Sequence, residues 1–147
     1  AMRTLNPPQR SKMIRNLAIS ADLMGQRLFA PPSVKGWDGG RAWINTSTMF
    51  MRQNTLLYLL TGQRPDGEPW ETGGAQFDAM PLVAGHTRDP KATITFLLSS
   101  LLNVDEPSRD RVTSLQDYMK TQHNKINNET VTGLITLITA MPEYQLC

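Results

Sequence analysis

The densest group of side chains that could do chemistry stands around two tryptophans near the first third of the chain. Trp37 and Trp43 are separated by five residues, and Lys35, Asp38 and Arg41 lie beside or between them. Indole faces with neighbouring charges and hydrogen-bonding groups suit a sugar ring or a peptide. Lys35, Trp37, Asp38, Arg41 and Trp43 are therefore the candidate binding residues.

The same stretch also fits a purely structural corner. Two prolines fix φ before the first tryptophan, and three glycines around it allow positive φ or close backbone approach. Trp37 and Trp43 would then cover the junction of two helices, with Asp38 capping a turn through its own backbone. Both interpretations of this segment, the Trp loop (residues 29–44), stay open at this point.

A catalytic interpretation needs an acid or a base near the Trp loop, and His86 is one candidate. It stands in a glycine-containing stretch and could act as a general base, with Lys35, Asp38 and Arg41 completing a hydrolase-like site. A surface imidazole is the simpler interpretation. His123 follows a predicted helix, where a cation suits the helix dipole.

Asp110 and Asp117 fall two turns apart on one predicted helical face. Paired carboxylates can divide acid and base roles. The flanking Arg109 and Arg111 favour a solvated face of ion pairs instead. No catalytic residue can therefore be assigned.

Several chemistries are not expected. The chain has one cysteine, Cys147, and two histidines, whereas a structural zinc site needs about four ligands. It has no phosphate-binding loop, dinucleotide fingerprint or nucleophile elbow. We therefore expect no metal and no cofactor.

The charge and hydropathy of the chain bear on its partners. The net charge is only +2, and the sequence has no dense basic stripe, so no nucleic-acid partner is expected. No apolar run approaches the roughly 20 residues of a membrane span.

Helical periodicity predicts the elements that position these residues. Apolar residues recur at steps of three and four, most clearly at Val131, Leu134, Ile135 and Ile138. Cap signals mark several starts, among them Asn45 and Asp89 before Pro90, with Asn127 or Asn128 before the last helix. The sequence predicts an all-α fold, a compact bundle of about five helices forming a single domain over residues 1–147. The expected ranges are 9–28, 45–60, 90–102, 108–122 and 128–141.

Two long loops interrupt this pattern. The Trp loop joins the first two helices, and a second Gly/Pro-rich loop over residues 62–88 joins the second and third. A structureless loop of that length is unusual inside a compact domain. It is either an ordered meander pinned by its apolar residues or a mobile lid, and a short helix around 77–82 fits the first alternative.

The pattern PPSVKGW-x-GG-x-x-WI over residues 31–44 resembles a signature of a large bacterial family, the domain of unknown function numbered eighteen hundred. The end of the chain, Met141-Pro142-Glu143-Tyr144-Gln145-Leu146, is similar to the family's closing pattern. The resemblance implies that the chain is the C-terminal region of a longer protein. It also implies that this protein is exported to the periplasm, the medium or the cell surface. Asp38 departs from the proline of many members, and no family reaction exists from which a catalytic residue could be carried over.

These observations favour a non-catalytic structural or interaction module of an exported bacterial protein. It would pack against the N-terminal remainder of its own protein or present the Trp loop to a glycan or protein ligand. One alternative is part of a hydrolase-like active site. Another is a carbohydrate-binding module that uses Trp37, Trp43 or Trp70.

Overall fold

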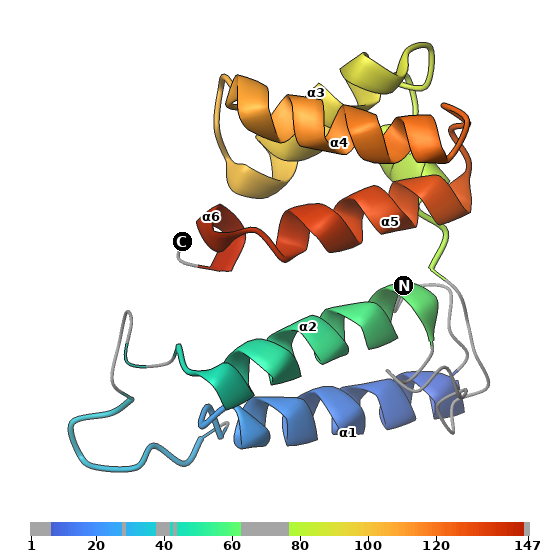
Figure 1. Ribbon diagram of the computed structural model, residues 1–147. Helices are drawn as coiled ribbons and strands as arrows, with labels where there is room; N and C mark the ends of the chain where they lie inside the picture. The colour runs from blue at the N-terminus through green and yellow to red at the C-terminus, as the bar shows by residue number, and fades with distance from the viewer. Residues whose placement is uncertain (1–6, 28, 38–41, 43, 63–76, 146–147) are drawn as a thin grey trace. The chain divides into compact units, whose positions relative to one another are not determined.

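The computed structural model describes residues 7–27, 29–37, 42, 44–62 and 77–145, and this part of the chain is all-helical (Figure 1). The predicted fold class is therefore confirmed, with five longer α-helices and no strand among the described residues. The chain divides into two compact units, Ala1–Phe77 and Asp78–Cys147. A single domain over the whole chain stays a prediction.

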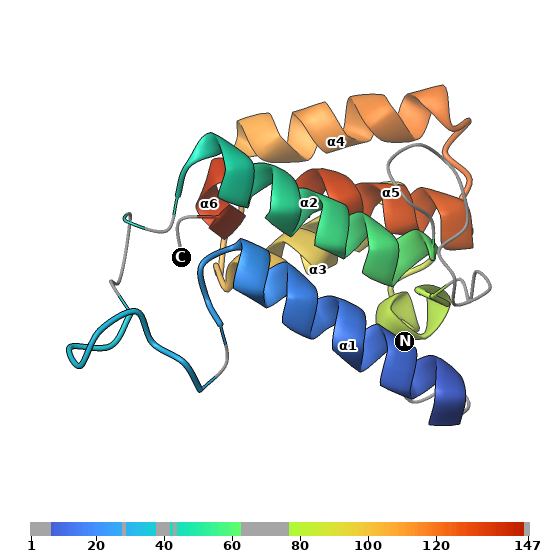
Figure 2. The ribbon, with the colours of Figure 1, turned by 90° about the horizontal axis from the view of Figure 1, so that it is seen from below.

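The first unit contains a pair of helices, α1 (Pro7–Leu23) and α2 (Thr46–Thr61), which lie side by side in both views (Figures 1 and 2). Met13 and Tyr58 are buried between them, and Leu17 and Leu59 pack against this pair. The Asn16 side-chain amide donates to the Tyr58 hydroxyl at 3.2 Å. The helices are thus joined by a small core with one polar contact across it.

Helix α1 ends at Leu23 and not at Leu28, where the apolar pattern placed its end. Gly25 has a φ of 76°. The amides of Gln26 and Gly25 donate to carbonyls of the last helical turn at 2.8 and 2.9 Å. This pair of bonds is a Schellman motif, which ends a helix at a left-handed glycine. The start is also earlier than predicted, at Pro7, because proline is well tolerated in a first helical turn.

Helix α2 has the predicted cap. The Asn45 side chain accepts from the Thr48 amide at 3.0 Å, and the Asn45 amide donates to the Thr48 hydroxyl at 3.0 Å. This reciprocal arrangement satisfies two backbone donors that a helix start leaves free. Gly62, with a φ of 69°, ends the helix as predicted.

The second unit is built around α3. Its elements are η3 (Met80–Val83), α3 (Pro90–Leu102), α4 (Arg109–Thr121), α5 (Asn128–Thr139) and α6 (Pro142–Gln145). Helix α3 contacts all four others. Its Ile94 and Leu98 are fully buried together with residues of the two neighbouring long helices, namely Leu115, Met119, Leu134 and Ile138. Each such side chain contributes roughly 1.5–3 kcal/mol, so this core outweighs that of the first unit.

Side-chain caps start the helices of the second unit. Asp89 accepts from the Ala92 amide at 3.2 Å, with Pro90 in the first helical position. Asn127, rather than Asn128, caps α5 by accepting from the Thr130 amide at 2.8 Å.

The side chain of Asn128 has a different role. Its oxygen accepts from the Ala79 amide at 2.7 Å, and Ala79 is fully buried just before η3. This bond ties the segment before η3 to the start of α5. The expected short helix is thus present at 80–83, whereas residues 63–76 of the predicted loop lie outside the described residues.

The last long helix ends earlier than the predicted residue 141. Helix α5 ends at Thr139, and Pro142 instead begins α6. The buried Gln145 side chain donates to the Thr139 carbonyl at 2.7 Å. It thereby satisfies one of the carbonyls that a helix end leaves free. Among the described residues, no helix has both the length and the apolar character needed to cross a membrane.

Helices α4 and α5 approach closely at Gly133, which gives a first prediction. A Cβ there would collide with the Tyr118 hydroxyl and lie 2.9 Å from Cζ of its ring. We expect Gly133→Ala to lower the free energy of unfolding by about 1 kcal/mol, because overpacking outweighs the helix propensity of alanine. In a Tyr118→Ala background the same change should instead raise it. Urea unfolding followed by circular dichroism tests this double-mutant cycle, and additive effects would contradict it.

The Arg111–Glu143 ion pair, at 2.8 Å, gives a second prediction. A backbone hydrogen bond of Glu143 and the hydrogen bond from Arg111 lower the pKa of this carboxyl. A lowered folded-state pKa contributes stability above the ordinary glutamate pKa of about 4.3, and this is lost as the pH falls through the lowered value. Glu143→Gln should therefore flatten the dependence of Tm on pH in the acid range. Glu106→Gln is the control, and identical acid profiles for Glu143→Gln and the wild type would refute the linkage.

Candidate functional site

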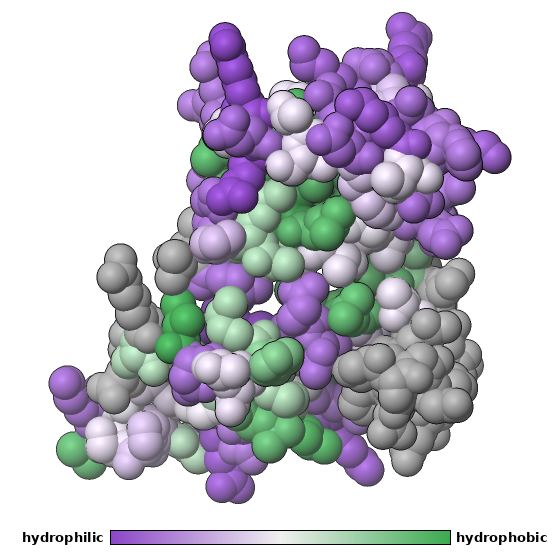
Figure 3. Space-filling model, viewed as in Figure 1, coloured by the Kyte–Doolittle hydropathy of each residue, from purple (hydrophilic) through white to green (hydrophobic). Residues whose placement is uncertain are grey.

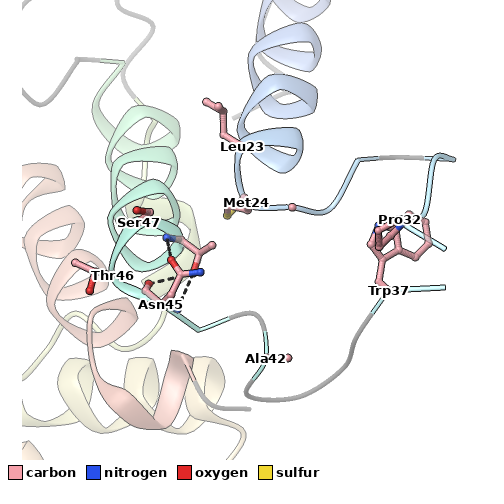
Figure 4. Close-up of a pocket in the computed structure, with 10 residues that line it drawn as sticks. Leu23, Met24, Pro32, Trp37, Ala42, Asn45, Thr46 and Ser47 are labelled. Atoms are coloured by element: carbon pink, nitrogen blue, oxygen red, sulfur yellow. Dashed lines mark hydrogen bonds between the residues drawn. The ribbon is translucent and has the colours of Figure 1, made fainter. Parts of the chain in front are cut away.

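A pocket of about 670 Å³ lies in the first unit, where the end of α1, the Trp loop and the start of α2 meet. It is lined by residues 23–25, 32, 37, 42 and 45–48. Figure 4 shows Leu23 and Met24 at the end of α1, Pro32 and Trp37 on the loop side, and the start of α2 on the opposite side of the open space.

The Schellman motif at Gly25 sets one wall of this pocket, because it turns the chain out of α1 and into the Trp loop. Within the loop, the Gly36 amide donates to the Ser33 carbonyl at 3.0 Å, and the Lys35 amide donates to the Ser33 hydroxyl at 3.3 Å. Gly36 itself has a φ of 94°. This turn leads directly into Trp37.

The first turn of α2 forms the opposite wall. The Asn45 oxygen is held by the cap, so its amide nitrogen remains able to donate. Thr46 and Ser47 are exposed and belong to the pocket lining. Their backbone amides, the first two of the helix, have no acceptor within it. None of the described lining residues carries an ionisable side chain, so this wall is polar but uncharged.

The predicted binding residues differ in whether the structure describes them and places them at the pocket. Trp37 lines the pocket and is 38% exposed, so part of its indole is open to solvent. Lys35 is exposed in the preceding turn and is not one of the described lining residues. Asp38, Arg41 and Trp43 lie outside the described residues, and their roles stay predictions.

The contacts described for His86 are made within the second unit. Its ring stacks on Phe96 of α3, with ring centroids 4.0 Å apart and an interplanar angle of 11°. Its carbonyl accepts from the Thr93 hydroxyl at 2.7 Å. These contacts fix the chain that leads into α3. A catalytic convergence of His86 with Lys35 stays a prediction, because the two belong to different units.

Of the two carboxylates on α4, Asp117 forms an ion pair, but its partner is not one of the neighbouring arginines. Asp117 pairs with Lys120 at 2.7 Å, and both side chains are exposed. Arg111 reaches Glu143 instead. A second pocket, of about 480 Å³, lies beside that latter pair and is otherwise lined largely by Leu102, Val104 and Pro107.

Sequence reasoning found Trp37 but missed the other walls of the pocket. The predicted helix over residues 9–28 includes Met24, and Thr46 and Ser47 directly follow the predicted cap at Asn45, where helix capping explains them. The available signal was the glycine at position 25, which can end a helix as well as interrupt one. An earlier helix end would have placed Met24 beside the Trp loop.

The described residues form helical units, and the first of these units contains a pocket. The described residues contain no group of three or more His, Cys, Asp or Glu side chains that could hold an ion. The chain belongs to the family described as Protein of unknown function (DUF1800), whose model matches residues 1–146. No curated protein and no solved structure matches it.

The turn before Trp37 gives a third prediction. A Cβ at Gly36 would meet nothing within 4 Å, so a side chain there costs only backbone strain. We expect Gly36→Val to lower the stability of the first unit by more than about 1 kcal/mol. All three tryptophans lie in residues 1–77, so tryptophan fluorescence during urea unfolding reports this unit. Lys35→Val should stay within about 0.5 kcal/mol of the wild type. Equal midpoints for both variants would show that the turn is not rigid.

Proposed function

We propose that this chain is a non-catalytic interaction module of an exported bacterial protein. The contact is made by the outward residues of the Trp loop, Phe29 and Val34, against the remainder of the same, longer protein. Export and the longer protein rest on the resemblance of the Trp loop and the chain end to family patterns. The contact itself is supported by the properties of the loop.

Phe29 is the observation that carries this proposal. It has a φ of 63°, a left-handed conformation that costs a bulky L-residue roughly 1–2 kcal/mol. Its side chain is also 97% exposed. A residue that is both strained and unburied contributes little to the free domain. Strain of this kind concentrates where a surface is preorganised for a ligand or partner.

Other apolar side chains of the first unit are also exposed to solvent. Val34 is fully exposed, and Ile14, Ile19 and Leu23 of α1 are more than half exposed. Figure 3 shows apolar side chains gathered over α1. Because helices in proteins derive most of their stability from packing, a pair with so small a core gains from a further apolar partner.

Several titratable side chains of the second unit already have contacts within that unit. The His86 ring is stacked on Phe96, Asp117 is paired with Lys120, and Glu143 with Arg111. An enzyme leaves its acid and base free to reach a substrate. These contacts support a binding role over the hydrolase-like alternative.

Hydrogen exchange tests the contact. Backbone amides of residues 29–36 should exchange more slowly in the full-length protein than in this chain alone, because the partner surface covers them. Phe29→Asn, which tolerates a left-handed backbone, should restore fast exchange in the full-length protein. Leu82→Asn is the matched control, since Leu82 is an exposed leucine of the second unit. Equal exchange in the two proteins would overturn the proposed contact.

The non-catalytic part has a separate test. The chain should not turn over glycan, ester or peptide substrates. Turnover that is abolished by Lys35→Ala, with the fold intact by circular dichroism, would show that the module is part of an enzyme.

A further inference from the structure

From the charges beside Phe29 and Val34, we infer that the surface they contact is an apolar patch bordered by carboxylates. This inference rests on the proposed function, and it adds the chemistry of the partner surface. Arg27 and Lys35 would pair with acidic side chains at the border of that patch. The contact would therefore weaken as the salt concentration rises, because salt screens exposed charges.

The first of two turns that carry these side chains spans residues 27–30. The Ala30 amide donates to the Arg27 carbonyl at 3.2 Å, which closes the turn. Phe29 lies within it, and the side chains of Arg27 and Phe29 are both exposed. One apolar and one cationic side chain thus stand on the same short turn.

The second turn, residues 33–36, repeats this combination. The Gly36 amide donates to the Ser33 carbonyl at 3.0 Å, and Val34 and Lys35 lie between these two residues. Both of their side chains are exposed. In both views, the described part of the loop extends beyond the ends of α1 and α2, so neither helix of the first unit covers it (Figures 1 and 2).

The net charge of this segment does not depend on the placement of residues 38–41. Between Leu23 and Asn45 the sequence has three cations, Arg27, Lys35 and Arg41, and the single carboxylate of Asp38. Asp38 can neutralise at most one of the three. A net charge of +2 remains, and counting Asp22, on α1 just before the segment, still leaves +1. A partner surface that carries negative charge is therefore favoured over a neutral or basic one.

The apolar side chains determine the rest of the partner surface. Protein interfaces have an apolar centre and a polar rim, and aromatic residues are enriched at the centre. Phe29 is 97% exposed and is held at a φ of 63°, so it meets a partner in a fixed position. The complementary surface is thus an apolar patch for Phe29 and Val34 with carboxylates around it.

An anionic membrane also combines apolar and acidic character, but it suits this segment less well. Sequence segments that bind anionic lipids usually carry clusters of about four to eight Lys or Arg. The segment between Leu23 and Asn45 has three cations and a net charge of +2. Its strained, hydrogen-bonded turns fit a protein surface of fixed shape better than a fluid interface.

Hydrogen exchange at two salt concentrations tests the inference. The quantity to measure is the exchange rate of residues 29–36 in this chain alone divided by the rate in the full-length protein. We expect this ratio to fall at least about threefold between roughly 0.05 and 0.5 M NaCl. In the lower salt, Arg27→Glu with Lys35→Glu should lower it at least about fivefold, because two attractive pairs become repulsive.

The matched control is Lys91→Glu with Lys125→Glu, which makes the same change of charge at two exposed lysines of the second unit. That control, and Arg27→Lys with Lys35→Arg, should keep the wild-type ratio. A wild-type ratio near one would overturn the proposed contact and this inference together. A high ratio that neither salt nor Arg27→Glu with Lys35→Glu changes would overturn only the acidic border, and the contact would then be purely apolar.

The membrane alternative has a separate outcome. This chain alone should not sediment with vesicles of phosphatidylcholine and phosphatidylserine in a ratio of about three to one. Sedimentation that is lost in Phe29→Asn and in Arg27→Glu with Lys35→Glu would overturn the inference in favour of a lipid surface.

Discussion

The structure depends on how backbone groups are satisfied where each helix ends. A helix leaves its first four amides and last four carbonyls without partners inside it. Here side chains of Asn45, Asp89 and Asn127 accept from amides at three helix starts. Left-handed glycines close both helices of the first unit, at Gly25 and Gly62. These caps decide where the loops begin, and so they decide where the pocket lies.

This constraint also explains what the sequence could predict. An N-terminal cap depends on residues within one turn, so Asn45 and Asp89 identified their helices correctly. A C-terminal end depends on whether a glycine adopts a left-handed conformation, and the sequence permits either outcome. Gly25 lies inside an apolar stripe that continues to Leu28, so the stripe predicts a longer helix than the observed α1. The predicted end of the last helix, at residue 141, is also too late, because α5 ends at Thr139 and Pro142 begins a separate turn.

The candidate site was predictable only in part for a related reason. Trp37 is conspicuous by its size and by the prolines and glycines around it. The hydroxyls of Thr46 and Ser47 have an ordinary structural explanation at a helix start, so nothing local marks them as pocket residues. Their position opposite Trp37 follows from the turn at Gly25 and from the packing of α1 on α2. A pocket formed by three segments is a tertiary property that no single stretch of sequence encodes.

The two units differ in how much apolar surface they bury, and this bears on where function resides. In the second unit, α3 contacts the four other elements, and its Ile94, Leu97 and Leu98 are withdrawn from water. In the first unit a small core around Met13 and Tyr58 supports a loop that holds Phe29 in a strained conformation. Binding surfaces are drawn from the less stable parts of a protein, because a surface that must meet a ligand cannot be buried within its own fold. The first unit has this character, because Phe29, Val34 and part of Trp37 remain exposed on the loop that follows α1.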